Sequence, residues 1–93
     1  MSILVRYAPE GMTAEMYEAV SEQLEAGPDW PPEGLEYHVC FGDDGDLKVS
    51  EIWASRKQFD DFAEKVMPVI AAGGIRMSRE PEILPVHHAE APA

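Results

Sequence analysis

The chain has 93 residues, of which 7 are basic and 18 acidic, so its formal net charge is −11. This length makes one small domain, and a hydrophobic fraction of 45% predicts that it is folded. The negative charge repels nucleic-acid phosphates and anionic lipids, which argues against nucleic acid and membranes as partners. One cysteine excludes an intrachain disulfide, and the sequence has no signal-like or membrane-spanning apolar run. We therefore predict a cytoplasmic protein.

The first third of the chain predicts a strand followed by a helix. Residues 2–8 are rich in β-forming side chains and end at a turn over 9–11. Thr13 is the expected N-cap of a helix that stops at 26–28, and its apolar stripe is formed by Met16, Tyr17, Val20 and Leu24. The loop 27–34 contains three prolines and Trp30. We interpret Trp30 as a plug over the edge of the core, with a pocket lid as the alternative.

The remaining sequence predicts a hairpin, a second helix and a last strand. Strands over 35–42 and 46–53 alternate in polarity and are joined by an Asp-Gly turn, whose acidic residues lack the spacing of a calcium loop. Ser55 opens a helix to about residue 72, in which Pro68 predicts a kink or break. The strand over 82–88 contains Pro85, which predicts a sheet edge. We expect one domain over 1–88 and a flexible tail over 89–93.

This order of elements is βαββαβ, which predicts an α+β, ferredoxin-like fold with a four-stranded antiparallel sheet. The first and third strands are then central. An RNA-recognition module would need a basic surface and stacking aromatics in the third strand, and a metal chaperone would need two cysteines. The sequence has neither.

The segment from Gly45 to Phe62 carries a family resemblance. A strand that ends in Glu51-x-Trp53, a Ser55 cap and a helix with inward aromatics resembles the antibiotic-biosynthesis-monooxygenase-like proteins, which are dimeric α/β barrels. The resemblance implies a homodimer in which two sheets pack face to face. Some members are cofactor-free oxygenases of aromatic polyketides, and others degrade haem. Many relatives have a histidine where this chain has Phe62, and oxygenases often have an asparagine where it has Val49.

Strand alternation predicts which side chains face the helices. It places Tyr37 and Val39 under the helices together with Val49, Glu51 and Trp53, and turns His38 and Cys40 toward a partner sheet. Two hypotheses for Glu51 remain: a buried base, or a pair with Arg6 or Arg56 at the strand end, which we favour. For His38 we favour a hydrogen bond across the dimer over acid–base work, and for Cys40 a small buried hydrophobe over a nucleophile.

Two functions fit these observations. The first is a small-molecule-binding, cofactor-independent oxygenase or isomerase acting on an aromatic or polyketide-like substrate in a cleft between sheet and helices. Its candidate catalytic residues are Glu51 and His38, and its substrate-binding residues are Tyr37, Trp53, Phe62, Val49 and Trp30. The second is a non-catalytic homodimeric binding or structural module. Neither needs a cofactor, and a metal site would have to recruit His87 or His88, so we predict none.

Overall fold

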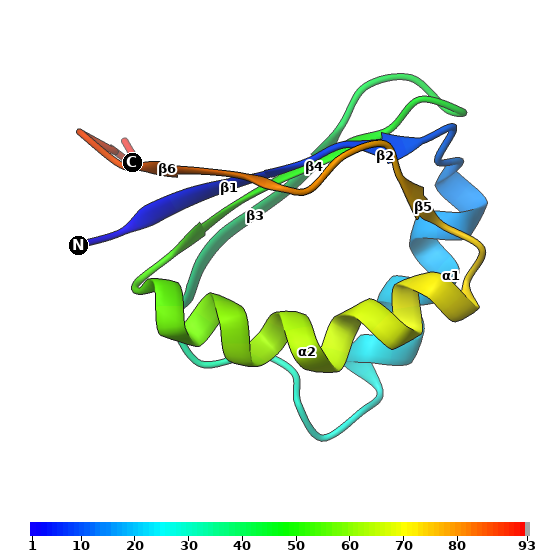
Figure 1. Ribbon diagram of the computed structural model, residues 1–93, viewed down its shortest axis with the longest axis horizontal. Helices are drawn as coiled ribbons and strands as arrows, with labels where there is room; N and C mark the ends of the chain where they lie inside the picture. Colours follow the sequence, from blue (N-terminus) through cyan, green and yellow to red (C-terminus); the bar gives the residue numbers. More distant parts are fainter. Residues whose placement is uncertain (93) are drawn as a thin grey trace.

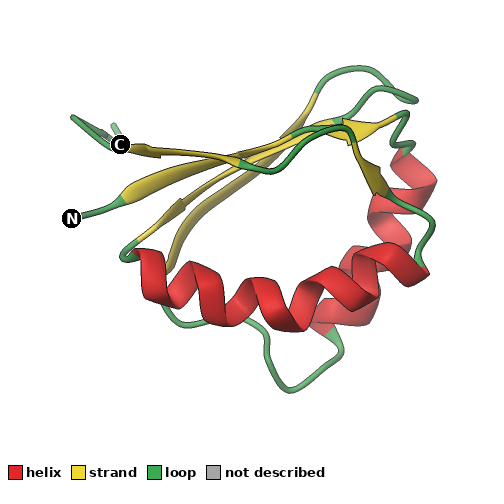
Figure 2. Ribbon diagram, viewed as in Figure 1, coloured by secondary structure: helices red, strands yellow, loops and turns green. Residues whose placement is uncertain are grey.

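Two helices cover one face of a four-stranded antiparallel sheet in the computed structural model, which describes residues 1–92 (Figure 1). Along the chain the elements are β1 (Ile3–Tyr7), β2 (Pro9–Glu10), α1 (Ala14–Glu25), β3 (Leu35–Phe41), β4 (Lys48–Trp53), α2 (Arg56–Ala72), β5 (Arg76–Met77) and β6 (Glu82–Pro85). Figure 2 shows that α1 and α2 lie on the same side of the sheet, so its opposite face carries no helix.

The strand order in the large sheet is β3-β4-β1-β6. This order confirms the ferredoxin-like prediction, including the central positions of the first and third predicted strands. β6 is an edge strand as expected, but it ends at Pro85, although the Val86 N–H still donates to the Ser2 carbonyl at 3.0 Å. Residues 86–92 have no helix or strand, and Ala93, the end of the predicted tail, lies outside the described residues.

A second, two-stranded sheet pairs β2 with β5. The sequence predicted only a turn at Pro9 and Glu10. Their partners Met77 and Arg76 lie far along the chain, so no local sequence pattern indicates the pairing.

Both predicted helix caps are confirmed. The hydroxyl of Thr13 accepts from the Met16 N–H at 3.1 Å, and that of Ser55 accepts from the Gln58 N–H at 3.2 Å. The predicted break at Pro68 is wrong, because α2 continues to Ala72. Pro68 is exposed, so the carbonyl one turn earlier that loses its helical partner lies on the solvent side.

The core consists of two apolar clusters between the sheet and the helices. The first contains Val5, Trp53, Phe59, Phe62 and Val66, and the second contains Met12, Val20, Val49 and Ile75. Trp53 is fully buried, and its ring centroid lies 5.4 Å from that of Phe62 and 5.9 Å from that of Phe59. These contacts fix the end of β4 against the first two turns of α2.

A β-bulge at the start of β3 overturns the predicted faces of this strand. Leu35 lies opposite Trp53 while Tyr37 lies opposite Ile52, so Glu36 is an extra residue. Beyond it His38 lies opposite Glu51, and cross-strand partners share a face. His38 and Cys40 therefore face the helices. The alternate residues, Tyr37, Val39 and Phe41, face the other way, because a slip of one residue exchanges the two faces.

None of the helices formed by residues 1–92 is long and apolar enough to cross a membrane.

Candidate functional site

A cleft of about 240 Å³ opens between the sheet and the two helices. Its walls are mostly apolar and come from both core clusters, from α1 and from the small sheet. The apolar lining is Pro9, Met12, Val20, Leu24, Trp30, Val49, Phe62, Val66, Ile70, Ile75 and Met77. The volume lies just below the usual range of about 300–1,000 Å³ for ligand pockets, so the cleft suits a small molecule of one or a few rings.

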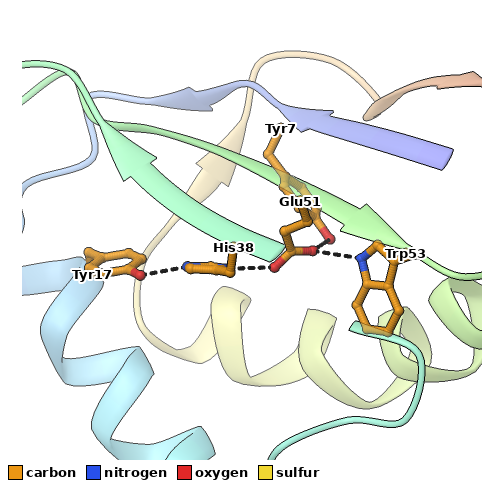
Figure 3. A network of polar contacts seen from close by, with 5 residues as sticks. All are labelled: Tyr7, Tyr17, His38, Glu51 and Trp53. Carbon is orange, nitrogen blue, oxygen red and sulfur yellow. Dashed lines mark hydrogen bonds and ion pairs between the residues drawn. The ribbon is translucent and has the colours of Figure 1, made fainter. Parts of the chain in front are cut away.

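A polar network lies in the sheet wall of this cleft (Figure 3). His38 Nδ1 lies 2.7 Å from Glu51 Oε2, and His38 Nε2 lies 2.6 Å from the Tyr17 hydroxyl. The other carboxylate oxygen, Glu51 Oε1, accepts from the Tyr7 hydroxyl at 3.1 Å and from Trp53 Nε1 at 3.0 Å. The network thus runs from α1 through β3 to the centre of the sheet.

The protonation pattern of the network follows from its donors and acceptors. A carboxylate only accepts, so His38 Nδ1–H donates to Glu51. In the neutral ring Nε2 is then the acceptor, and the Tyr17 O–H donates to it. The side chain of Glu51 is 6% exposed and that of His38 is 29% exposed. A buried carboxylate therefore orients an imidazole that lines the cleft and whose second nitrogen is bonded to the Tyr17 hydroxyl.

Local structure explains why these residues meet. Glu51 alternates with Val49 and Trp53 on the buried face of β4. The bulge in β3 brings His38 opposite Glu51, and β1 places Tyr7 opposite Val49, one step along the same face. Tyr17 reaches the network from α1, where its ring lies end to end with that of His38, at a centroid distance of 6.0 Å (Figure 3).

Burial keeps both tyrosines of the network protonated. It is the main cause that raises the pKa of Tyr7 above its ordinary range, followed by the negative charge of Glu51 and the hydrogen bond to it. Burial likewise raises the pKa of Tyr17. Both hydroxyls are therefore donors at neutral pH. Burial also raises the pKa of the Cys40 thiol, which works against a thiolate nucleophile.

The predicted substrate-binding residues divide into three groups. Val49, Phe62 and Trp30 line the cleft. Trp53 lies behind Glu51 and holds it through Nε1 without lining the cleft. Tyr37 is 57% exposed on the opposite face of the sheet, a consequence of the bulge.

The two candidate catalytic residues come together, though not as the favoured interpretations had it. Glu51 is buried and pairs with His38; it pairs with neither Arg6 nor Arg56, which form ion pairs with Glu82 and Asp60. His38 likewise finds its partners within the chain, in Glu51 and Tyr17. The interpretation of His38 was wrong because the predicted faces of β3 did not include the bulge at Glu36. That of Glu51 was wrong because its side chain is buried and does not reach the solvent.

Sequence reasoning missed Tyr7 and Tyr17. Tyr17 was assigned to the apolar stripe of its helix, where the ring does lie, but its hydroxyl reaches across to the sheet. Tyr7 looked like an ordinary strand residue. A tyrosine in an otherwise aliphatic buried pattern was the available signal, because a buried hydroxyl needs a partner.

Such an arrangement can do acid–base chemistry. A carboxylate that fixes the tautomer and orientation of an imidazole makes Nε2 the nitrogen that can accept a proton, once a bound molecule replaces the Tyr17 hydroxyl there. Within residues 1–92, no three His, Cys, Asp or Glu side chains converge as a metal site requires.

The fold has clear relatives among solved structures. No protein-family model matches the sequence, and no curated protein matches it significantly. SnoaB, a cofactor-independent oxygenase from Streptomyces nogalater, superposes with a TM-score of 0.61 at 17% identity, covering 95% of this chain and 93% of SnoaB. Rv0793 from Mycobacterium tuberculosis gives a TM-score of 0.59 at 17% identity over 96% of this chain and 97% of its own.

A candidate antibiotic biosynthesis monooxygenase from Chloroflexus aurantiacus gives a TM-score of 0.56 at 21% identity, covering 96% of this chain and 95% of its own. At these identities the likeness establishes the fold alone. The chain thus has the ferredoxin-like fold of the antibiotic-biosynthesis-monooxygenase-like proteins, as the Glu51-x-Trp53 segment predicted.

Proposed function

We propose that the protein binds a small aromatic molecule in the cleft and acts on it as a cofactor-independent oxygenase. The observation that supports this most is the buried Glu51–His38 pair in the wall of an otherwise apolar cleft. Burying a carboxylate is costly, and an apolar side chain of similar size would serve a purely structural core at least as well. A pocket with one convergent acid–base pair is the arrangement expected of an active site.

In this proposal His38 is the general base. The hydroxyl or acidic C–H of the substrate takes the place of the Tyr17 hydroxyl at Nε2 and gives up its proton there. Glu51 holds the ring through Nδ1–H and stabilises the imidazolium that forms, while Tyr7 and Trp53 hold Glu51. Tyr17 then donates its hydrogen bond to the substrate anion or to solvent.

The substrate anion supplies the electrons of the reaction, and dioxygen accepts them. An activated methylene group reacts with one O₂ to give a carbonyl group and one water. Two C–H bonds are broken, one oxygen atom enters the product, and the other leaves in water with both hydrogens. The protein contributes the base, the orientation of the ring system and a cleft poor in water.

Oxygen uptake with anthrone, an aromatic with an acidic methylene between its rings, tests the proposal. We expect the wild-type protein to accelerate uptake and His38→Gln to lower the rate by about 10²–10⁴-fold, the usual share of a general base. His87→Gln is the matched control, because His87 is exposed on the C-terminal segment. Equal rates for wild type and His38→Gln would contradict the assignment of the base.

The second candidate is a non-catalytic homodimeric binding or structural module. Its homodimeric part is supported by the apolar outer face of the sheet, where Tyr37 and Leu84 are 57% and 39% exposed. Saturable binding of anthrone without any oxygen uptake would favour this candidate.

We also propose that the outer face pairs two copies of the chain, in either case. Cross-strand register places Tyr37, Ile52, Leu4 and Leu84 in one apolar row across all four strands. Exposed apolar rows of this kind mark association surfaces.

A further inference from the structure

We infer that the cleft selects neutral or cationic aromatic ligands that carry a hydrogen-bond donor, such as phenols and protonated amines, and discriminates against carboxylates and phosphates. This inference rests on the proposed ligand-binding function, and it names the class of molecule that the site takes.

The first support is that the donors of the network are already engaged. Tyr7 O–H and Trp53 Nε1–H both donate to Glu51 Oε1, and His38 Nδ1–H donates to Oε2. The Tyr17 O–H is directed at His38 Nε2. What the network offers a ligand is therefore an acceptor, the imidazole Nε2 once Tyr17 is displaced, next to a Tyr17 hydroxyl that can then donate or accept. A ligand must supply the hydrogen, as a phenol or an ammonium group does.

The second support is the sign of the charges in the cleft. Glu51 lies in its wall and Glu25 is exposed at its rim, where α1 ends. A carboxylate or phosphate on the ligand would meet these like charges in a partly desolvated site, and that costs binding affinity.

The third support is where the positive charges are. Five of the seven Lys and Arg side chains form ion pairs with acidic residues: Arg6, Lys48, Arg56, Lys57 and Lys65. Arg76 neighbours Met77, which lines the cleft, but it is exposed and pairs in register with Glu10, so strand alternation turns it to the other face. A net charge of −11 adds a field that repels anions from the whole surface.

Four naphthalene derivatives of matched shape test the inference: naphthol, naphthylmethylammonium, naphthoate and naphthalene. Affinities are measured by isothermal titration calorimetry at neutral pH and moderate salt. We expect naphthol and naphthylmethylammonium to bind at least about tenfold more tightly than naphthoate, with naphthalene between them. Naphthoate that binds as tightly as naphthol overturns the inference and leaves the ligand-binding function standing. Failure of all four to bind overturns both.

A charge reversal locates the effect in the cleft. Glu25→Lys should strengthen naphthoate binding several-fold and weaken naphthylmethylammonium binding. Glu18→Lys is the matched control, because it makes the same change in net charge on an exposed position of α1 that does not line the cleft. Equal rescue of naphthoate by both variants would show that overall charge sets the preference, and would overturn the assignment to the cleft.

Discussion

Among residues 1–92, Glu51 is the only charged side chain buried in the core, and three neighbouring side chains donate hydrogen bonds to it. Two of them, Tyr7 and Trp53, belong to the apolar framework, so the same side chains that pack the core also orient the acid–base pair. Stability and site geometry are therefore coupled at this residue. Substitutions of its neighbours should therefore change both the free energy of unfolding and the geometry of the acid–base pair.

Trp53 should be the most costly single truncation in the core. Trp53→Ala removes a fully buried ring that packs on Phe59 and Phe62, and it leaves Glu51 without one donor. We expect a loss of about 3–5 kcal/mol in the free energy of unfolding, measured by urea denaturation. Trp30→Ala, a truncation of the half-buried loop tryptophan, should cost clearly less. Comparable losses for the two variants would mean that Trp53 is not the centre of the core.

Tyr7 should make the fold sensitive to alkaline pH. Its pKa is raised above the ordinary value of about 10, first by burial and then by Glu51. Above about pH 10 the unfolded chain loses this proton while the folded chain keeps it. The stabilisation is complete below that pH and is lost as the pH rises toward the folded-state pKa, by about 1.4 kcal/mol per pH unit.

The measurement is a series of urea denaturation midpoints from about pH 8 to about pH 11, across the ordinary pKa of tyrosine. The decline should be shallower in Tyr7→Phe than in the wild type. Tyr37→Phe, on the exposed face, serves as the control for removal of one hydroxyl. Parallel curves for wild type and Tyr7→Phe would contradict the prediction.

At the scale of elements, Pro68 is a residue that disfavours a helix, and α2 nevertheless continues through it. It lies inside α2 on the exposed side and cannot donate to the helix ladder. Pro68→Ala should restore that hydrogen bond and raise the free energy of unfolding by about 1–2 kcal/mol, after allowance for the greater freedom of the unfolded chain. Met67→Ala, an exposed neighbour, should change it by less than about 0.5 kcal/mol. A lower urea midpoint for Pro68→Ala would show that the proline supports the helix.

The elements themselves were predictable because their signals are local. Thr13 and Ser55 cap helices whose apolar stripes follow them directly, and the Asp-Gly turn joins two alternating strands. The faces of β3 were not predictable in the same way. An extra residue at Glu36 is visible only in the pairing with β4, and it moves His38 from the outer face to the cleft.

The candidate site was therefore only half predictable. Glu51 stood out as the acidic residue in an apolar alternation, and its neighbours Val49 and Trp53 followed from the same strand. Tyr17 and His38 meet through a contact between a helix and a sheet, which no spacing in the sequence encodes. The rings of Tyr7 and Tyr17 fit an apolar pattern, so the hydrogen bonds of their hydroxyl groups were not predicted.

At the scale of the whole molecule, the sheet is covered on one face only. The covered face holds both core clusters and the cleft, whereas the outer face exposes the row formed by Tyr37, Ile52, Leu4 and Leu84. A domain of 93 residues buries a modest fraction of its surface, so covering this row would contribute substantially to its stability. A second copy of the chain is the simplest way to cover the row, because the same row then packs against itself about a twofold axis.

Sedimentation at micromolar concentration should accordingly give a particle of about twice the 10.3 kDa of one chain. Ile52→Lys places a charge in the middle of the apolar row and should shift the protein to the monomer, because an unpaired buried cation is strongly unfavourable. Gln23→Lys adds the same charge at an exposed position of α1, away from the sheet's outer face, and should leave the dimer intact. A wild-type protein that sediments as a monomer at these concentrations would contradict the pairing. Dissociation of the dimer by both variants would show that overall charge, and not the apolar row, controls the pairing.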